Sequence, residues 1–266
     1  MHPTDAELAV TAAEAGAAVV RAKYGAPLAH FAKSPMDFAT DADLEAERAI
    51  LDILRAARPG DGFLGEEAGA VGPAATRTWL VDPLCGTLNY AARTPLVSVN
   101  VALRDNGSST VAAVADPLAG EVLWTDGRQA QLRHDGVDEP LAPSARTRLV
   151  DVNLDGPYPN ADWFRAVQLL AAPEFGAAFG PRVSSTTLAL AWVAAGRRAG
   201  YVTDGHLRDS VHFTSGIALC QAAGCVVTGL RGQPLHTGVE GLVAAADPQT
   251  HAALVAIVDQ QHERLA

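Results

Sequence analysis

The feature that most constrains the fold is the alternation of helix and strand patterns along the chain. Residues 5–23 carry apolar side chains at helical spacing, and the stretch "YGAPL" ends that pattern. A second helical pattern follows Thr40, which is expected to cap it, with Asp43 placed like the acid of a capping box. Strand patterns follow at Phe63-Leu64, 78–82, 96–103 and 110–116. Such alternation is typical of layered α/β proteins, in which helices cover sheets.

The chain is expected to have two lobes. A stretch containing Pro and Gly, "DGVDEPLAPSART", separates two halves near residues 136–147. We therefore expect an N-terminal α+β lobe over residues 1–145 and a C-terminal α/β lobe over residues 146–266. The second half predicts strands at 148–153, 199–203 and 225–228, and helices near 161–172, 184–196, 211–223 and 248–262.

Composition excludes several classes of partner. The formal net charge of −10 disfavours binding to nucleic acid or to an anionic membrane surface. The chain contains no apolar run of the roughly 18 residues that a membrane span needs. The start "MHPTDAELAV" lacks the basic region of a secretory signal, and three cysteines without a CxxC pair do not form a disulfide framework. The expected location is the cytoplasm, with reduced thiols.

Acidic residues gather in three clusters before the midpoint of the chain. The clusters are Asp37, Asp41 and Asp43; "GEE" at 65–67; and "DPLCGT" at 82–87. Carboxylates at strand ends and loop tips suit hard cations such as Mg²⁺, which prefer oxygen ligands and share phosphate oxygens. A solvated surface is the ordinary explanation of any single cluster, but three in this order point to a common site.

The order and spacing of these motifs resemble the inositol monophosphatase family of Mg²⁺-dependent sugar-phosphate phosphatases. The matching stretches are "SPMDFATDADLEAE", "FLGEEAG", "WLVDPLCGTLNY" and "VHFTSGIALCQAAGCVVT". The resemblance covers nearly the whole chain and implies a layered αβαβα sandwich and a homodimer. It also implies that Glu66 and Asp82, together with the Leu84 carbonyl, hold a first metal ion.

The resemblance implies roles for four further residues. Glu67 and Thr87 would support a water nucleophile, and Asp43 would lie near the site. Asp204 aligns with an acidic residue that contacts substrate hydroxyls in the family. Lys33 is offset by one position from the basic residue of the family, so no role is carried over to it.

Two positions depart from the family pattern. Cys85 and His212 stand where the family has two aspartates that bind the same second metal, and Val211 replaces a tryptophan. Two oxygens on one Mg²⁺ at roughly 2.1 Å lie about 3 Å apart. The thiol and the imidazole are therefore expected within about hydrogen-bond reach of each other, with Asp82 as a third member.

The leading hypothesis is a metal-independent enzyme that requires no cofactor. Cys85 would attack an ester or thioester of a small or carrier-bound acyl substrate, with His212 as base and Asp82 as its partner. A position at a helix N-terminus would lower the pKa of the Cys85 thiol. The Gly86 and Thr87 amides, which cradle a phosphate in the family, would form an oxyanion hole.

Two alternatives remain open. One is a metal-dependent phosphatase acting on a small sugar or polyol phosphate, with Mg²⁺ held by Glu66, Asp82 and the Leu84 carbonyl. In a variant of it, Zn²⁺ is held by Cys85, His212, Asp82 and Glu66, because thiolate and imidazole favour that ion. The other alternative is a non-catalytic pseudophosphatase, which the retained carboxylates disfavour.

Overall fold

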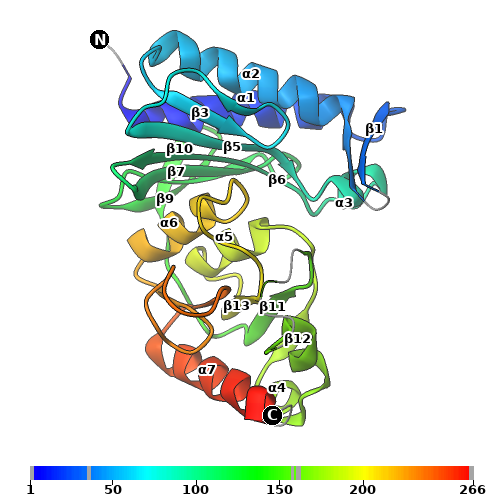
Figure 1. The fold of residues 1–266 in the computed structure, drawn as a ribbon, viewed down its shortest axis with the longest axis vertical. Coiled ribbons are helices and arrows are strands. Elements are labelled where there is room, and N and C mark those ends of the chain that lie inside the picture. Colours follow the sequence, from blue (N-terminus) through cyan, green and yellow to red (C-terminus); the bar gives the residue numbers. More distant parts are fainter. Residues whose placement is uncertain (1–2, 35–36, 157–158, 160–162, 264–266) are drawn as a thin grey trace. The chain divides into compact units, whose positions relative to one another are not determined.

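The computed structural model describes residues 3–34, 37–156, 159 and 163–263 (Figure 1). The chain divides into two compact units, and each is continuous in space but not in sequence. The first comprises Met1–Pro140, Thr186–Leu188 and Val211–Leu219, and the second comprises Leu141–Ser185, Ala189–Ser210 and Cys220–Ala266. The segment that carries His212 thus belongs to the first unit, whereas the sequence analysis assigned it to the C-terminal lobe.

The first unit is built on a sheet that has eight strands within the described residues, in the order β10-β9-β8-β7-β6-β5-β3-β4. Strands β3 and β5 pair in parallel, and the other neighbours pair antiparallel. The strands are β3 (Gly62–Gly65), β4 (Gly69–Val71), β5 (Arg77–Cys85), β6 (Ser98–Asp105), β7 (Ser108–Asp116), β8 (Glu121–Thr125), β9 (Ala130–His134) and β10 (Val137–Pro140).

Strands β8, β9 and β10 correct the sequence analysis, which predicted none of them. Strand β10 lies inside the stretch that was interpreted as a separator between lobes. All four of its residues are exposed, so it has no alternation of apolar and polar side chains from which a strand can be recognised. Its pairing with β9 extends the sheet instead of ending the lobe.

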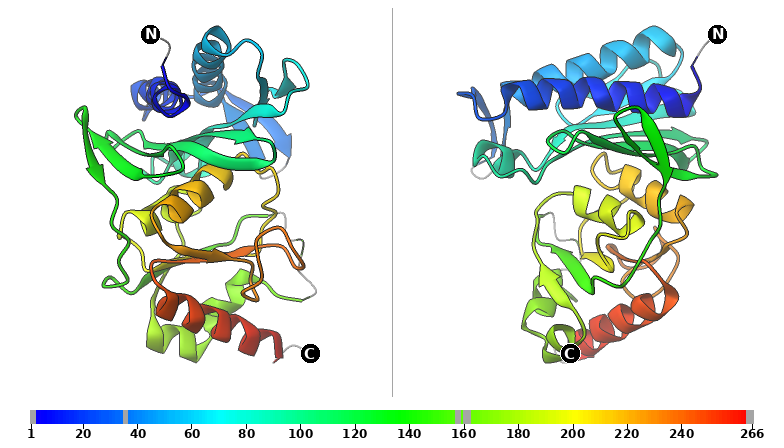
Figure 2. Two further views of the ribbon diagram at one scale, coloured as in Figure 1. Left: turned by 90° about the vertical axis from the view of Figure 1, so that its left-hand side faces the viewer. Right: turned by 180° about the vertical axis from the view of Figure 1, so that it is seen from behind.

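Two helices cover one face of this sheet, α1 (Asp5–Lys23) and α2 (Asp41–Ala57) (Figure 2). The predicted bounds of α1 are confirmed. The predicted capping box of α2 is also confirmed, because the Thr40 side chain accepts a backbone N–H of the first turn and Asp43 accepts the Thr40 N–H at 2.7 Å. A short helix, α3 (Thr87–Ala91), and a hairpin of β1 (His30–Ser34) and β2 (Asp37–Thr40) complete this part of the chain.

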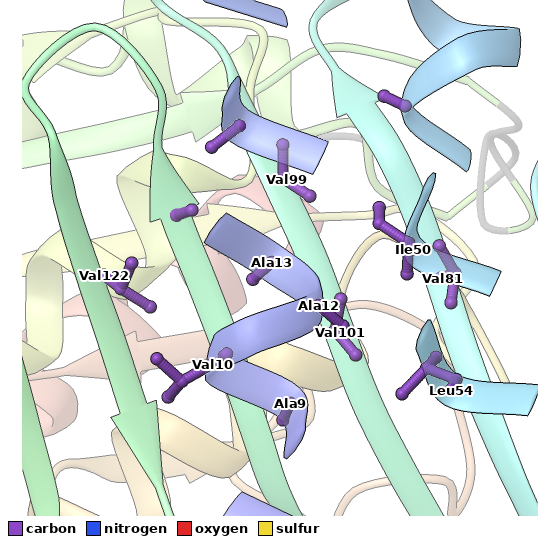
Figure 3. Close-up of a cluster of buried hydrophobic side chains, with 14 of the residues drawn as sticks. Ala9, Val10, Ala12, Ala13, Ile50, Leu54, Val81, Val99, Val101 and Val122 are labelled. Atoms are coloured by element: carbon purple, nitrogen blue, oxygen red, sulfur yellow. The ribbon is translucent and has the colours of Figure 1, made fainter. Parts of the chain in front are cut away.

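Small side chains let α1 approach the sheet and α2 closely. A Cβ atom on Gly16 would lie only 2.6 Å from Cδ1 of Ile50 and 3.0 Å from Cγ1 of Val99, so a larger residue would force these core side chains to shift. Figure 3 shows the core that results, with α1 and α2 lying over the apolar side chains of β5, β6 and β8. The labelled core residues are Ala9, Val10, Ala12, Ala13, Ile50, Leu54, Val81, Val99, Val101 and Val122.

The segment Val211–Leu219 packs against the same sheet through a second, smaller cluster. In this cluster Ala218 contacts Leu80 of β5 and the alanines of β6 and β7, Ala102 and Ala112, and Val211 packs against its edge. These contacts fix the segment on β5, the strand that also carries Asp82 and Cys85.

The second unit contains a sheet that, among the described residues, has the strand order β12-β11-β13-β15-β14. The first three pair in parallel and the last three antiparallel. The elements of the second half of the sequence are β11 (Leu149–Asn153), the 3₁₀ helix η1 (Ala166–Ala171), α4 (Pro173–Ala178), β12 (Gly180–Arg182), α5 (Leu188–Ala194), β13 (Gly200–Thr203), α6 (Thr214–Ala222), β14 (Val226–Thr228), β15 (Leu242–Ala245) and α7 (Pro248–Glu263). Most of α6 lies in the segment that belongs to the first unit.

The elements of the second half agree with most of the expectations. The helix expected near 161–172 is a 3₁₀ helix over residues 166–171, and residues 161–162 lie outside the described residues. Mixed sheets with helices packed on them confirm the predicted layered α/β class. None of the helices that the structure describes is long and apolar enough to cross a membrane.

Truncation of a core side chain on α2 tests the packing of the first unit. Leu54→Ala is expected to lower the free energy of unfolding by about 2–5 kcal/mol, because it leaves a cavity at a fully buried position. Asp52→Ala, on the exposed face of the same helix, should change it by less than about 0.5 kcal/mol. Urea denaturation followed by circular dichroism measures both, and equal losses in the two variants would contradict the packing described.

His251 gives the second unit a dependence of stability on pH. Burial lowers the pKa of this histidine, whose Nε2 lies 2.7 Å from Oγ1 of Thr228. The unfolded chain then binds a proton more readily than the folded one, so stability falls as pH drops through about 6.5. We expect His251→Gln to flatten the change in thermal midpoint between about pH 7.5 and about pH 5.5. An unchanged slope would show that His251 does not contribute.

Candidate functional site

The candidate residues Asp82 and Cys85 lie at the end of strand β5, where its pairing with β6 becomes irregular. Its register against β6 shifts between Asp82 and Cys85, where Pro83 interrupts the ladder. Asp82 is completely buried and Cys85 is 9 % exposed. The Leu84 N–H donates to Oδ1 of Asp82 at 3.1 Å, which holds the carboxylate on its own turn. Gly86 then adopts a left-handed conformation, with φ of 99°, and begins α3.

The structure brings Asp82, Cys85 and His212 together. Nδ1 of His212 lies 2.8 Å from Oδ2 of Asp82. One carboxylate oxygen, the Cys85 sulfur and one ring nitrogen all lie within 4.8 Å of one another. All three residues belong to the first unit, so their proximity depends only on the packing of Val211–Leu219 against the sheet.

Two residues that the sequence analysis missed surround this cluster. Thr187 donates to the Cys85 sulfur through its N–H at 3.3 Å and through its hydroxyl at 3.1 Å. Asn100 of β6 donates to Oδ2 of Asp82 at 3.2 Å and to the Thr187 hydroxyl at 3.0 Å. The run "SSTT" before an apolar helix was the available sequence signal for Thr187, whereas nothing in the sequence marks Asn100.

The pKa of the Cys85 thiol is shifted in the direction opposite to the one that the sequence analysis predicted. Burial and the Asp82 carboxylate raise the pKa of the Cys85 thiol, and hydrogen bonds from His212 and Thr187 do not offset them. Burial opposes protonation of His212, but the Asp82 carboxylate and Cys85 outweigh it and raise the pKa of the imidazole. The predicted lowering of the thiol pKa is therefore wrong, because the thiol lies beside a carboxylate and α3 is only five residues long.

Glu66 and Glu67 follow β3 and lie beside Lys33. The Lys33 ammonium is 3.2 Å from Oε1 of Glu66 and 2.6 Å from Oε1 of Glu67. Burial and the adjacent Asp82 carboxylate raise the pKa of Glu66 to about 8. Oε2 of Glu66 is buried and has no hydrogen-bond partner among the described residues. The resemblance assigned no role to Lys33, but its ammonium group contacts both carboxylates of this acidic pair.

Thr87 and Asp43 form a second polar pair in the same unit. The Thr87 hydroxyl lies 3.0 Å from Oδ1 of Asp43 and 3.2 Å from the Leu84 carbonyl oxygen. Asp43 is fully buried, and burial raises its pKa, although hydrogen bonds from Thr40 oppose this shift. The role of the Gly86 and Thr87 amides in anion binding stays a prediction.

Glu47 is a further residue that the sequence analysis did not single out. Its buried carboxylate accepts the Glu67 N–H at 2.9 Å and the Ala68 N–H at 2.8 Å, and so shapes the loop after β3. A Cβ atom on Gly65 would collide with this carboxylate. Glycine at position 65 therefore allows Glu47 to reach the backbone of the loop that carries Glu66 and Glu67.

Asp204 belongs to the second unit, whereas the site residues described above belong to the first. It follows β13, is 1 % exposed, and forms an ion pair in which its Oδ2 is 3.2 Å from Nε of Arg165. Its carboxylate already has a cationic partner, and its expected contact with substrate hydroxyls stays a prediction.

The inositol monophosphatase family model matches residues 3–263, and the chain belongs to this family. The inositol-1-monophosphatase of Caulobacter vibrioides is 37% identical over 174 residues, which is 62% of this chain and 66% of that protein. The Nus factor SuhB of Escherichia coli is 32% identical over 267 aligned positions, which is 96% of each chain. The crystal structure of SuhB from Bartonella henselae superposes with a TM-score of 0.83 at 25% identity, covering 96% of this chain and 98% of that one.

These comparisons correct the leading hypothesis. Acyl transfer or hydrolysis by a catalytic Cys85–His212–Asp82 triad is wrong as the function, because the chain belongs to the inositol monophosphatase family and its relatives include proteins named inositol-1-monophosphatase. The expectation that no cofactor is required is wrong for the same reason, since members of the family depend on Mg²⁺. The homodimer, the absence of nucleic-acid and membrane partners, and the cytoplasmic location stay predictions.

The residues present fit a hard cation at the first metal position that the resemblance implies, and not at the second. Glu66 with its unpartnered buried oxygen, the Asp82 carboxylate and the Leu84 carbonyl offer oxygen ligands of the kind that Mg²⁺ prefers. The sulfur of Cys85 and the imidazole of His212 do not suit Mg²⁺. The structure thus supports one family-type Mg²⁺ position and argues against the second.

The contact between Gly65 and Glu47 generates a prediction about the loop that carries Glu66. Gly65→Ala is expected to lower the free energy of unfolding by about 2–4 kcal/mol, because the methyl group displaces Glu47 from two backbone N–H groups. Gly60→Ala, where a Cβ atom meets nothing within 4 Å, is the matched control and should be nearly neutral. Similar stabilities of the two variants in urea denaturation would overturn this account of Glu47.

Proposed function

We propose that this protein is a divalent-metal-dependent phosphatase that hydrolyses the phosphate monoester of a small polyol or sugar. The observation that carries the proposal is the pairing of Thr87 with buried Asp43 in the same unit as Glu66 and Asp82. Membership of the family supports it, as does the name of the Caulobacter vibrioides relative. An enzyme of this kind needs a cation beside the phosphate and a group that orients water.

Glu66, Asp82 and the Leu84 carbonyl would hold the cation. When bound, a divalent ion supplies positive charge that polarises the phosphoryl oxygens and favours loss of a proton from water. Lys33 adds a fixed positive charge beside Glu66 and Glu67, and so limits the repulsion between these carboxylates and an approaching phosphate dianion.

Thr87 and Asp43 would orient the attacking water. The Thr87 hydroxyl donates a hydrogen bond to Oδ1 of Asp43, which leaves an Oγ1 lone pair to accept a hydrogen bond from the attacking water. The water oxygen attacks phosphorus, the ester P–O bond breaks, and the leaving oxygen takes up a proton. The products are inorganic phosphate and the free alcohol. Because Asp43 is anchored by the capping box of α2, the direction of the hydroxyl is fixed before substrate binds.

The proposal predicts release of inorganic phosphate from a panel of sugar and polyol monophosphates in the presence of Mg²⁺. Thr87→Ala should reduce kcat by about 10²–10⁴-fold, because the group that orients the water is lost. Thr11→Ala, on the exposed face of α1, is the control and should leave kcat unchanged. A colorimetric phosphate assay on the metal-reconstituted protein provides the measurement.

Two results would contradict the proposal. One is phosphate release that persists at the same rate after chelation of divalent ions. The other is the absence of release from every monophosphate of the panel, with Mg²⁺ and with Zn²⁺, by protein shown to be folded by circular dichroism.

A further inference from the structure

We infer that Asp82, Cys85 and His212 form a second metal site that selects Zn²⁺ or a similarly soft divalent ion over Mg²⁺. The inference concerns metal binding itself and is tested without substrate, so it goes beyond the proposed phosphatase activity and does not rest on it.

The cluster is compact enough for its three ligand atoms to reach one tetrahedral ion. Its three candidate ligand atoms lie within 4.8 Å of one another. Bonds of about 2.0–2.3 Å to a tetrahedral Zn²⁺ place neighbouring ligand atoms about 3.3–3.8 Å apart. The contact of 2.8 Å between His212 and Asp82 would therefore lengthen by roughly 0.5–0.7 Å. The His212 side chain is 42% exposed, so its ring has room to make this adjustment.

The chemistry of the three donors selects the ion. A thiolate and an imidazole are ligands that favour Zn²⁺, whereas Mg²⁺ demands six oxygen ligands in near-octahedral geometry. With Cys85 as thiolate, His212 neutral and Asp82 ionised, the ligands carry two negative charges, which balance a divalent ion. Three protein ligands leave one tetrahedral position unfilled, as in catalytic rather than structural zinc sites.

The surroundings of the sulfur are those of a metal thiolate. The N–H and the hydroxyl of Thr187 both donate to the Cys85 sulfur, and Asn100 donates to both Thr187 and Asp82. Donors around ligand atoms orient them and stabilise their ionised forms. They offset part of the burial that raises the pKa of the free thiol, and a bound cation would offset the remainder.

Binding of Co²⁺ to the full-length, metal-stripped protein tests the inference. Co²⁺ at this site is expected to give thiolate-to-cobalt charge-transfer absorption and the strong visible bands of tetrahedral cobalt. Zn²⁺ should abolish both signals, and Mg²⁺ in large excess should not. Cys85→Ser should remove the charge-transfer signal and weaken Zn²⁺ binding by roughly 100-fold or more. Cys225→Ser, a buried thiol outside the cluster, is the matched control and should keep both.

A second variant keeps the test independent of folding defects in Cys85→Ser. The double variant Cys85→Asp with His212→Asp offers only oxygen ligands, so it should lose the charge-transfer signal and bind Mg²⁺ in competition with Co²⁺. Charge transfer that survives in Cys85→Ser, or Mg²⁺ that displaces Co²⁺ from the wild-type site, would overturn the inference. Intact cobalt binding without any phosphatase activity would overturn the proposed function alone.

Discussion

A fully buried carboxylate, Asp82, is the constraint on which the rest of the site depends. An ionised group in the interior is costly unless charges and hydrogen bonds surround it. Here they come from three directions: Leu84 of its own turn, Asn100 of β6, and His212 of the segment that packs on the sheet. Burial opposes ionisation of Asp82, but His212 outweighs it and lowers the pKa of the carboxylate.

This pairing explains how the site accommodates Cys85 and His212 at the positions where the resemblance implies two aspartates. In an all-carboxylate site the acidic groups repel one another, and cations must be present to hold them together. With His212 in place of one carboxylate, the protein supplies its own positive charge beside Asp82. Lys33 does the same for Glu66 and Glu67. The acidic cluster is therefore balanced by protein groups on both sides, which the sequence motifs alone did not show.

The sequence predicted the parts of the fold that depend on local pattern. The bounds of α1, the capping box at Thr40 and the strand leading to Asp82 all follow from spacing over a few residues. Strands β9 and β10 could not be predicted in this way, because short, partly exposed strands acquire their order from pairing with neighbours and not from their own side chains. Strand β8 is mostly buried, and its apolar run Val122-Leu123-Trp124 was a strand signal that the sequence analysis overlooked.

The same distinction applies to the candidate site. Motif positions predicted that Cys85 and His212 would meet, because the resemblance places both where the family has ligands of one ion, and their proximity is confirmed. The direction of the thiol pKa was mispredicted, because it is set by burial and by a charge that only the folded chain brings close. Thr187 and Asn100 were missed because they are 102 and 87 residues from their partners in the sequence, Cys85 and Thr187 respectively. Resemblance to a family thus located the side chains that meet, while their ionisation depended on neighbours that only the structure identifies.

Asp82 also couples the two metal positions that the site offers. Its Oδ2 faces His212 and Asn100, while its Oδ1 accepts the N–H of Leu84, the residue whose carbonyl is expected to bind the harder ion. A soft ion bound by Cys85 and His212 would draw on Oδ2 and would release the imidazole from its role as counter-ion. The negative charge of Asp82 would then be shared between two cations of different character. On the proposed assignment, the chain would keep the oxygen-rich position that phosphate chemistry requires, and its second position would respond to a different metal.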